Sequence, residues 1–179
     1  LLWDRKGEYK RYSNAERGVS PLAFPQDKEA IVKVNSYEHD EFGITTEDPG
    51  ITKAMQDKRL AKEAYLSREL EGYETVKIYG NEASGTAILS WGSNKGVARE
   101  VAEKMGLKLI QVQVLWPFPI KKFQEALKGV KTLISVENNA TGQLARLIQG
   151  LGFKADKKIL KYDGRPFSVD ELEQKIQTT

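Results

Sequence analysis

From Thr75 onward the chain alternates short apolar runs with helical patterns, and this alternation narrows the folds open to it. The apolar runs are TVKIY (75–79), TAILSW (86–91), LKLIQVQVL (107–115), KTLISV (131–136) and a short run near residues 159–160. The turn GNEASG (80–85) follows the first run, and helical stretches follow the other runs, the last of them covering Val169–Ile176. Strands that alternate with helices at this spacing are typical of a largely parallel sheet covered on both faces. We therefore predict a three-layer α/β/α sandwich around a mostly parallel five-stranded sheet.

The N-terminal part of the chain lacks this alternation. Residues 1–28 carry several Gly and Pro and few periodic apolar positions, which indicates an irregular arm. The run AIVKV (30–34) predicts a short strand, and the polar stretch 35–48 predicts turns. A helix is expected to start near Pro49, because Pro is favoured at the first helical position, and to run to about Glu71. This helix is highly charged, so most of its surface should contact water.

These patterns divide the chain into two parts. Residues 1–72 hold the arm, the short strand and a linker helix, and residues 73–179 hold the α/β domain. The chain starts LLWDRKGEYKRY, without Met and unlike a signal peptide. We expect it to be a fragment whose preceding domain is missing.

Composition excludes several classes of function. The 28 basic and 25 acidic residues give a net charge of +3, a mixed surface that does not indicate a nucleic-acid-binding protein. The longest apolar runs are shorter than the roughly 18 residues that a membrane span needs. The chain has no Cys, which excludes disulfides, thiolate nucleophiles and Cys-ligated clusters within it. The absence of Cys together with many Lys and Glu favours an intracellular, cytoplasmic protein.

The stretch ISVENNATGQLARLIQG (134–150) places polar residues at the end of an apolar strand. Glu137, Asn138 and Asn139 come directly after the strand and in front of a new helix. In open α/β sheets the carboxyl ends of the strands are the edge where ligands bind. Two interpretations remain open: these residues bind a small polar ligand together with Gln143, or they cap the helix at Thr141.

The loop Gly92-Ser93-Asn94-Lys95-Gly96 joins a strand to a helix start. Free N–H groups and the helix dipole make such a loop able to hold an anion. It matches neither the P-loop pattern nor the GxGxxG fingerprint. The alternative is structural: the glycines form the turn and Ser93 is the N-cap of the helix.

Two further stretches allow more than one interpretation. The stretch Glu38-His39-Asp40-Glu41 contains the chain's one histidine and could be a solvated turn, a subunit contact or a metal site. The apolar stretch WPFP (116–119) could pack in the core or form a contact patch, with Pro119 at the first helical position. The lone histidine lies in an acidic turn, so no Ser/His/Asp set is available. No catalytic residue and no metal site is predicted within the chain.

Taken together, these motifs resemble a known family. LSWGSNKGVAREVAEKMGLKLIQVQVLWPFP and LISVENNATGQLARLI resemble the C-terminal transketolase-like domain of thiamine-diphosphate enzymes. Their order is similar to the α subunit of archaeal and bacterial 2-oxoacid:ferredoxin oxidoreductases. NSYEHDEFGITTEDPGITKAMQDKRLAKE (35–63) is most similar to the 2-oxoglutarate members, and KRYSNAERGVSPLAFP (10–25) resembles the linker that leaves their pyrimidine-binding domain. The resemblance covers essentially the whole chain.

The resemblance implies an activity that this chain would share with other subunits. The family oxidatively decarboxylates a 2-oxoacid, coenzyme A captures the acyl group, and an iron–sulfur cluster passes electrons to ferredoxin. The complete enzyme would use thiamine diphosphate, magnesium, the iron–sulfur cluster and coenzyme A, none of them bound by this fragment. The chain has no GDG…N diphosphate motif and no Cys, and in the family the β subunit carries these parts. The implied partners are that β subunit, ferredoxin and, in addition, γ and δ subunits, with no nucleic acid and no membrane.

The resemblance also implies structural details. The pyrimidine-binding domain is expected upstream of Leu1, the strand Thr75–Tyr79 is expected to be antiparallel at the edge of the sheet, and the fragment is expected to be inactive alone.

Two residues of the arm become candidates for substrate contact through the resemblance. In the family this linker lies near the substrate, so Arg11 and Ser20 are expected to contact the 2-oxoacid, and Arg suits a dicarboxylate. The alternative for Arg11 is a solvated charge. The family often has Ser-Pro-Arg in this linker, whereas this chain has Ser20-Pro21-Leu22.

The remaining candidates are assigned to a subunit interface or ligand edge, and Glu137, Asn138 and Asn139 also to a helix cap. The interface set is Glu38, His39, Asp40, Ser93, Asn94, Glu137, Asn138 and Asn139. Two rival functions remain: a family member acting on pyruvate or branched-chain oxoacids, and a stand-alone module that binds a phosphorylated ligand at Gly92–Gly96.

Overall fold

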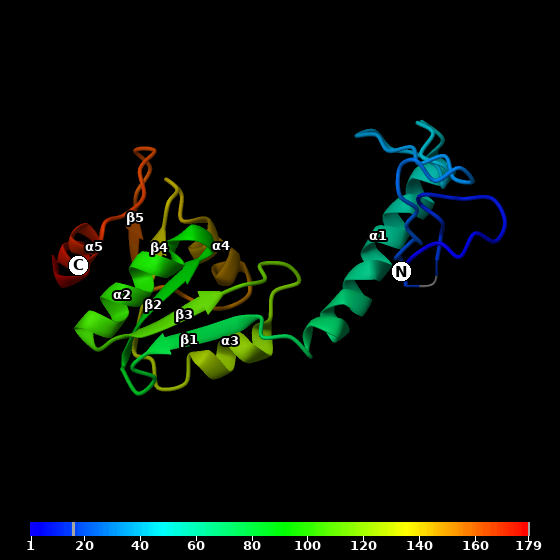
Figure 1. The fold of residues 1–179 in the computed structure, drawn as a ribbon. Coiled ribbons are helices and arrows are strands. Elements are labelled where there is room, and N and C mark those ends of the chain that lie inside the picture. The colour runs from blue at the N-terminus through cyan, green and yellow to red at the C-terminus, as the bar shows by residue number, and fades with distance from the viewer. Residues whose placement is uncertain (16, 179) are drawn as a thin grey trace. The chain divides into compact units, whose positions relative to one another are not determined.

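The computed structural model describes residues 1–15 and 17–178. The chain forms two compact units, Leu1–Glu69 and Leu70–Thr179 (Figure 1). The C-terminal unit holds the sheet and four of the helices. Its elements are β1 (Val76–Gly80), β2 (Thr86–Trp91), the 3-10 turn η1 (Gly92–Asn94), α2 (Lys95–Met105), β3 (Lys108–Val112), α3 (Ile120–Ala126), β4 (Thr132–Glu137), α4 (Gln143–Gly150), β5 (Lys157–Leu160) and α5 (Val169–Thr178).

The five strands form one sheet in the order β1-β3-β2-β4-β5. Strand β3 pairs parallel to β2, β2 parallel to β4, and β4 parallel to β5. Strand β1 lies at the edge and pairs antiparallel to β3, with Ile78 opposite Ile110. The predicted mostly parallel sheet with one antiparallel edge strand is therefore confirmed.

Helices cover both faces of this sheet and give it two apolar cores. On one face Leu89 and Ile110 pack with residues of α3 and α4. On the other face Ile88 and Leu109 pack with residues of α2 and α5. Figure 1 shows α2 and α5 together, with α3 and α4 across the sheet from them. The strands are apolar in both alternating positions because both of their faces are covered, which is the pattern expected of parallel sheets.

Some element boundaries differ from the sequence prediction for identifiable reasons. Strand β3 ends at Val112 and not at Leu115, because the ladder with β2 stops at the pair Trp91–Val112. Pro119 is the N-cap of α3 and not its first residue. Its carbonyl accepts the hydrogen bond of the Phe123 N–H at 2.9 Å, a role that needs no N–H of its own.

The N-terminal unit is mostly irregular, and the predicted strand at residues 30–34 is wrong. No ladder forms there, and Ile31 is 87% exposed. Among the described residues, the bridges outside the named strands are the isolated pairs Leu2–Leu22 and His39–Thr45. The apolar alternation of residues 30–34 had no partner strand, and a strand is not stable without one.

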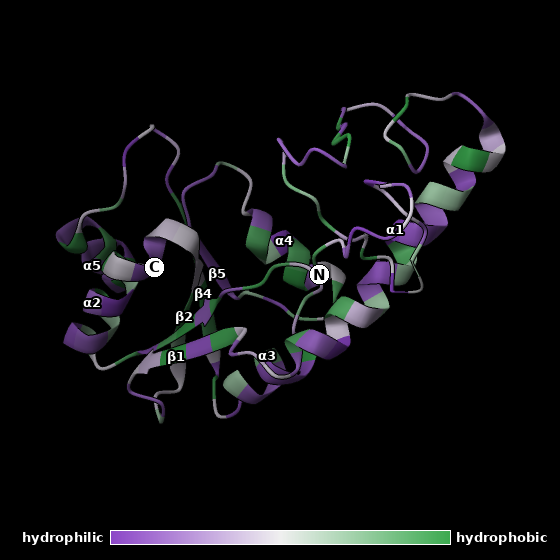
Figure 2. Cartoon of the chain, turned by 45° about the vertical axis from the view of Figure 1, so that its right-hand side comes forward, coloured by the Kyte–Doolittle hydropathy of each residue, from purple (hydrophilic) through white to green (hydrophobic). Residues whose placement is uncertain are grey.

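The regular element of this unit is α1 (Pro49–Leu70), which begins and ends close to the predicted positions. Polar and apolar residues are interleaved along its whole length in Figure 2, as the sequence indicated. Its buried residues are Met55 and Lys58. No helix in residues 1–15 and 17–178 is long and apolar enough to cross a membrane.

The aromatic centre of one core gives a direct test of this fold. Phe123 is fully buried and meets Phe118 and Phe153 edge to face, with centroids 5.2 Å and 5.1 Å away. We expect Phe123→Ala to lower the free energy of unfolding by about 3–5 kcal/mol, because it removes buried area and leaves a cavity. Urea unfolding measures this. The control Tyr162→Ala removes an exposed ring and should cost less than about 0.5 kcal/mol, and equal losses in both variants would contradict the placement of Phe123.

Candidate functional site

The parallel strands β2, β3, β4 and β5 all end at one side of the sheet, here called the carboxyl edge. The chain leaves β2 through η1 toward α2 on one face, and it leaves β4 toward α4 on the other face. Neighbouring strands whose connections leave to opposite faces mark the place where open α/β sheets bind ligands. The predicted residues Ser93, Asn94, Glu137, Asn138 and Asn139 all lie at this edge.

Glu137 lies at the end of β4 and is fully buried. Its carboxylate accepts hydrogen bonds from the N–H groups of Leu144 at 2.8 Å and Ala145 at 3.0 Å. It also accepts hydrogen bonds from the Ser135 hydroxyl at 2.9 Å and the Asn139 amide at 2.8 Å. Leu144 and Ala145 belong to the first turn of α4, whose N–H groups have no partner within the helix. The buried carboxylate therefore caps α4 from the preceding strand.

Asn139 completes this cap. Its Oδ1 accepts hydrogen bonds from the N–H groups of Thr141 at 3.1 Å, Gly142 at 2.7 Å and Gln143 at 3.2 Å. The N-cap residue of α4 is Gly142, in the left-handed conformation with φ 64°, and not Thr141. The prediction that this stretch caps the helix is thus confirmed, with the cap position shifted by one residue.

The charge of Glu137 fits this role. Burial raises the pKa of the Glu137 carboxyl, but the hydrogen bonds from Asn139, Leu144, Ala145 and Ser135 outweigh burial and hold it below the ordinary value of 4.5. Asn138 differs from its neighbours because it is exposed and donates to the Arg165 carbonyl at 3.2 Å. Of the three predicted residues, Asn138 is the most exposed.

The loop after β2 is built differently from the prediction. Ser93 lies exposed within η1, and the N-cap of α2 is Asn94 and not Ser93. The Asn94 side chain is buried and donates to the Val136 carbonyl at 3.5 Å, so it joins the β2 loop to β4. The N-terminus of α2 therefore has no side-chain cap.

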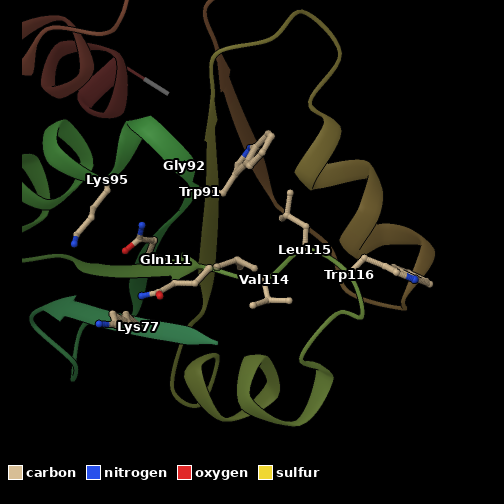
Figure 3. A pocket seen from close by; sticks show the side chains of 10 residues that line it. Lys77, Trp91, Gly92, Lys95, Gln111, Val114, Leu115 and Trp116 are labelled. Atoms are coloured by element: carbon tan, nitrogen blue, oxygen red, sulfur yellow. The ribbon is translucent and has the colours of Figure 1, made fainter. Parts of the chain in front are cut away.

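A hollow of about 740 Å³ lies beside this loop (Figure 3). Figure 3 shows Lys77, Lys95 and Gln111 on one side of it and Trp91, Leu115 and Trp116 on the other. Lys77 pairs with Glu74 at 2.8 Å, and Lys95 lies over the Tyr79 ring, 5.4 Å from its centroid. The buried Oε1 of Gln111 has no hydrogen-bond partner in the described part of the chain.

The WPFP stretch fits both of its interpretations. Trp116 lies at the rim of the hollow and is 59% exposed, whereas Phe118 is buried in the core.

The predicted residues of the arm gather around Tyr12 in the N-terminal unit. Arg11 is half-buried, and its guanidinium lies over the Tyr12 ring at 5.1 Å. No carboxylate within residues 1–15 and 17–178 forms an ion pair with Arg11. Ser20 donates its hydroxyl proton to the Ser13 carbonyl at 2.9 Å, so contact with a substrate as a donor would need that hydroxyl to turn. His39 stacks on Tyr12, with ring centroids 3.7 Å apart.

The acidic turn uses its polar groups internally. Asp40 Oδ1 accepts hydrogen bonds from the N–H groups of Phe42 and Ile44, both at 2.9 Å, which closes the turn. Glu38 pairs with Arg59, and this hydrogen bond lowers the pKa of Glu38. In the described residues no group of three or more acidic or histidine side chains could hold a metal ion. The structure places His39 buried, at 7% exposure, so the turn is packed and not fully solvated.

Reasoning from sequence did not identify Lys58, which contacts both Tyr12 and Ser20. Its ammonium donates to the Tyr12 carbonyl at 2.7 Å and to Ser20 Oγ at 2.6 Å. Nothing in the sequence distinguishes Lys58 from the other lysines of a charged helix. Only the fold of the arm against α1 brings these residues together.

Comparison with known proteins gives consistent matches. Residues 84–172 match the family model described as pyruvate:ferredoxin oxidoreductase core domain II. The chain is 34% identical over 178 residues to the α subunit of 2-oxoacid:ferredoxin oxidoreductase 2 from Aeropyrum pernix, covering 96% of this chain and 27% of that one. It is 36% identical over 176 residues to a 2-oxoacid:ferredoxin oxidoreductase α subunit from Saccharolobus solfataricus, covering 95% and 28%.

A solved structure is also similar over the whole chain. It is the 2-oxoglutarate:ferredoxin oxidoreductase of Magnetococcus marinus with 2-oxoglutarate, coenzyme A and succinyl-CoA bound. The TM-score is 0.72 at 28% identity, and the match covers 99% of this chain and 32% of that one.

The helix cap can be tested by removing its charge. We expect Glu137→Gln to lower the free energy of unfolding at neutral pH by about 1–3 kcal/mol, because the new amide turns an N–H₂ group toward buried donors. Urea unfolding at pH 7 measures this loss. The matched control Glu125→Gln changes a carboxylate that is 73% exposed and should cost less than about 0.5 kcal/mol.

The pH dependence separates the charge from the shape of the side chain. The pKa of Glu137 is lowered on folding, so its stabilisation is complete above the ordinary pKa of 4.5 and is lost as the pH falls through the lower folded value. The stability difference between wild type and Glu137→Gln should therefore shrink below about pH 4.5. A difference that stays constant down to acid unfolding would show that Glu137 does not act as a charged cap.

Proposed function

Because the chain belongs to the family of 2-oxoacid:ferredoxin oxidoreductase α subunits, we propose that it is part of an enzyme that oxidatively decarboxylates 2-oxoglutarate to an acyl-CoA and reduces ferredoxin. The chain spans about a quarter of the length of the curated relatives it matches, so the complete reaction needs further domains and subunits. The bound 2-oxoglutarate and succinyl-CoA of the similar structure support this choice of substrate.

The residues of this chain do not fit the family's redox and diphosphate groups. The chain has no Cys to ligate an iron–sulfur cluster, and among its described residues no group of three or more acidic or histidine side chains could hold a magnesium ion. We therefore assign thiamine diphosphate, magnesium and the cluster to the β subunit and derive no step through them. The part proposed for this chain is to bind and orient substrate and to hold subunits together.

The observation that carries the substrate proposal is the state of Arg11. Its guanidinium lies against an aromatic ring and has no ion-pair partner among the described residues. A planar guanidinium binds a carboxylate through two parallel hydrogen bonds, and 2-oxoglutarate has a second carboxylate that pyruvate lacks. We propose that Arg11 takes this second carboxylate and that Ser20 borders the same site.

At the carboxyl edge we propose a docking role. The Glu137–Asn139 cap fixes the turn after β4, and this rigid turn presents Asn138 to a partner subunit, together with the exposed Ser93. Glu38, His39 and Asp40 form a second rigid turn with the same proposed role.

The substrate contact is tested in the complete enzyme. We expect Arg11→Ala to raise the KM for 2-oxoglutarate about tenfold or more, because a hydrogen-bonded charge pair worth roughly 1.5–3 kcal/mol is lost. The KM values for pyruvate and 2-oxoisovalerate should change little, because these substrates lack the second carboxylate. The assay is reduction of ferredoxin or a viologen by full-length α subunit assembled with its β partner.

The control is Arg17→Ala, which removes an exposed charge from the same arm. A wild-type enzyme that prefers pyruvate or 2-oxoisovalerate would replace the 2-oxoglutarate proposal by the rival member of the family. An unchanged KM in Arg11→Ala would make Arg11 an ordinary surface charge.

A second candidate function is anion binding in the hollow beside η1. Lys77, Lys95 and Gly92 line it, and the two lysines supply positive charge there. These groups suit a phosphorylated ligand, which the chain would bind as a separate module.

Calorimetric titration of the chain with ATP and with pyrophosphate tests this candidate. Saturable binding that Lys95→Gln weakens about tenfold, and that Lys128→Gln does not affect, would support it; Lys128 is 78% exposed and lies outside the hollow. Binding that does not saturate, or that both variants weaken equally, would exclude it.

A further inference from the structure

Lys58 is a buried ammonium group in a helix that is otherwise rich in exposed charges. It is 9% exposed, and its side chain extends from α1 toward the arm. A buried charge costs free energy unless hydrogen bonds or opposite charges compensate for it. The contacts that compensate Lys58 therefore indicate what the residue does.

Among the described residues, Lys58 has two acceptors, and both lie in one segment, here called the arm loop (residues 12–15 and 17–20). The ammonium donates to the Tyr12 carbonyl at 2.7 Å and to Ser20 Oγ at 2.6 Å. Ser20 in turn donates to the Ser13 carbonyl at 2.9 Å. One lysine thus joins the first and last residues of the arm loop.

An independent observation shows that the arm loop lies directly on α1. Gly18 has φ 66°, and a Cβ atom at this position would be 2.7 Å from the Lys58 carbonyl oxygen and 2.9 Å from Lys62 Cβ. Only a glycine allows the backbone to approach the helix this closely. The arm loop therefore packs on α1 at the turn from which the Lys58 side chain extends.

The charges around Lys58 leave an excess of positive potential. The pKa of Lys58 is lowered to about 8, chiefly by burial and also by the nearby charges of Lys62, Arg11 and Arg59, while the Glu41 carboxylate opposes this shift. Glu41 itself accepts hydrogen bonds from the Asn14 N–H at 2.6 Å and from Lys10 at 3.2 Å. Arg59 is neutralised by Glu38, so Arg11 and Lys62 are the neighbouring cations without an ion-pair partner among the described residues, and two such cations suit an anionic ligand.

We propose that Lys58 is a positioning residue that holds the arm loop so that the adjacent Arg11 meets the second carboxylate of the 2-oxoacid. Arg11 directly precedes Tyr12, and its guanidinium rests on the Tyr12 ring, so fixing Tyr12 fixes the origin of the Arg11 side chain. Lys58 itself stays behind the loop and does not contact substrate. This inference rests on the proposed substrate role of Arg11.

The test is a double-mutant cycle in the assembled full-length enzyme. Lys58→Met keeps an unbranched side chain one atom shorter and removes its donors. We expect it to raise the KM for 2-oxoglutarate about tenfold, with kcat within about twofold, because it weakens a substrate contact without touching the reacting atoms. In an Arg11→Ala background the same change should raise KM less than about twofold, since Lys58 acts through Arg11.

The matched control is Lys53→Met on the same helix. Lys53 is 76% exposed and pairs with Asp57 at 2.5 Å, and its loss should leave both kinetic constants within about twofold of wild type. If the enzyme with Lys58→Met does not assemble, the same kinetic measurements are made on Lys58→Gln, which keeps a shorter donor. The same changes in KM and kcat are then expected.

The outcomes separate this inference from the proposed function. If Arg11→Ala leaves KM unchanged, the proposed substrate contact fails, whatever Lys58→Met does. If Arg11→Ala raises KM but Lys58→Met does not, or if the two effects are fully additive, only the positioning role is overturned. If neither Lys58 variant assembles, Lys58 holds the fold of the arm and the positioning role is likewise overturned.

Discussion

The carboxyl edge of the C-terminal unit depends on one buried charge, the carboxylate of Glu137. Strand β4 enters the core between β2 and β5, and a full negative charge at its end would be costly without compensation. The first N–H groups of α4 provide that compensation, and the helix in turn needs an acceptor for them. Strand end and helix start therefore stabilise each other, and the turn between them has little conformational freedom.

This coupling supports the docking role proposed for the edge. The polar atoms of Glu137 and Asn139 are engaged by the backbone of the turn, and Asn94 ties the neighbouring loop to β4. What remains accessible, chiefly Asn138 and Ser93, sits on a rigid support. Rigid loops lose little entropy on association, which favours a docking surface.

Much of the C-terminal unit could be predicted because its signals are local or periodic. The apolar runs at 86–91 and 131–136 locate β2 and β4 to within a residue, and the polar triplet after the second run indicates the helix cap. The run at 30–34 has the same local character and yet forms no strand, because a strand requires a partner that only the tertiary fold supplies. The prediction of Ser93 as the N-cap of α2 is wrong for a similar reason. The N-cap is Asn94, and its side chain forms a hydrogen bond with β4, a contact between residues distant in sequence.

The candidate substrate site shows where sequence reasoning stops. Arg11 and Ser20 could be named only through resemblance to a family, and Lys58 could not be named at all, because its partners lie 46 and 38 positions away. The arm loop has no helix or strand of its own, so its shape comes from polar contacts with α1 and with the turn that carries Glu41. A loop held in this way is ordered before a ligand arrives, and binding energy is not spent on arranging it. A substrate that differs by one carboxylate is distinguished best by a cation whose position is fixed in advance, and a buried lysine behind the loop can fix that position.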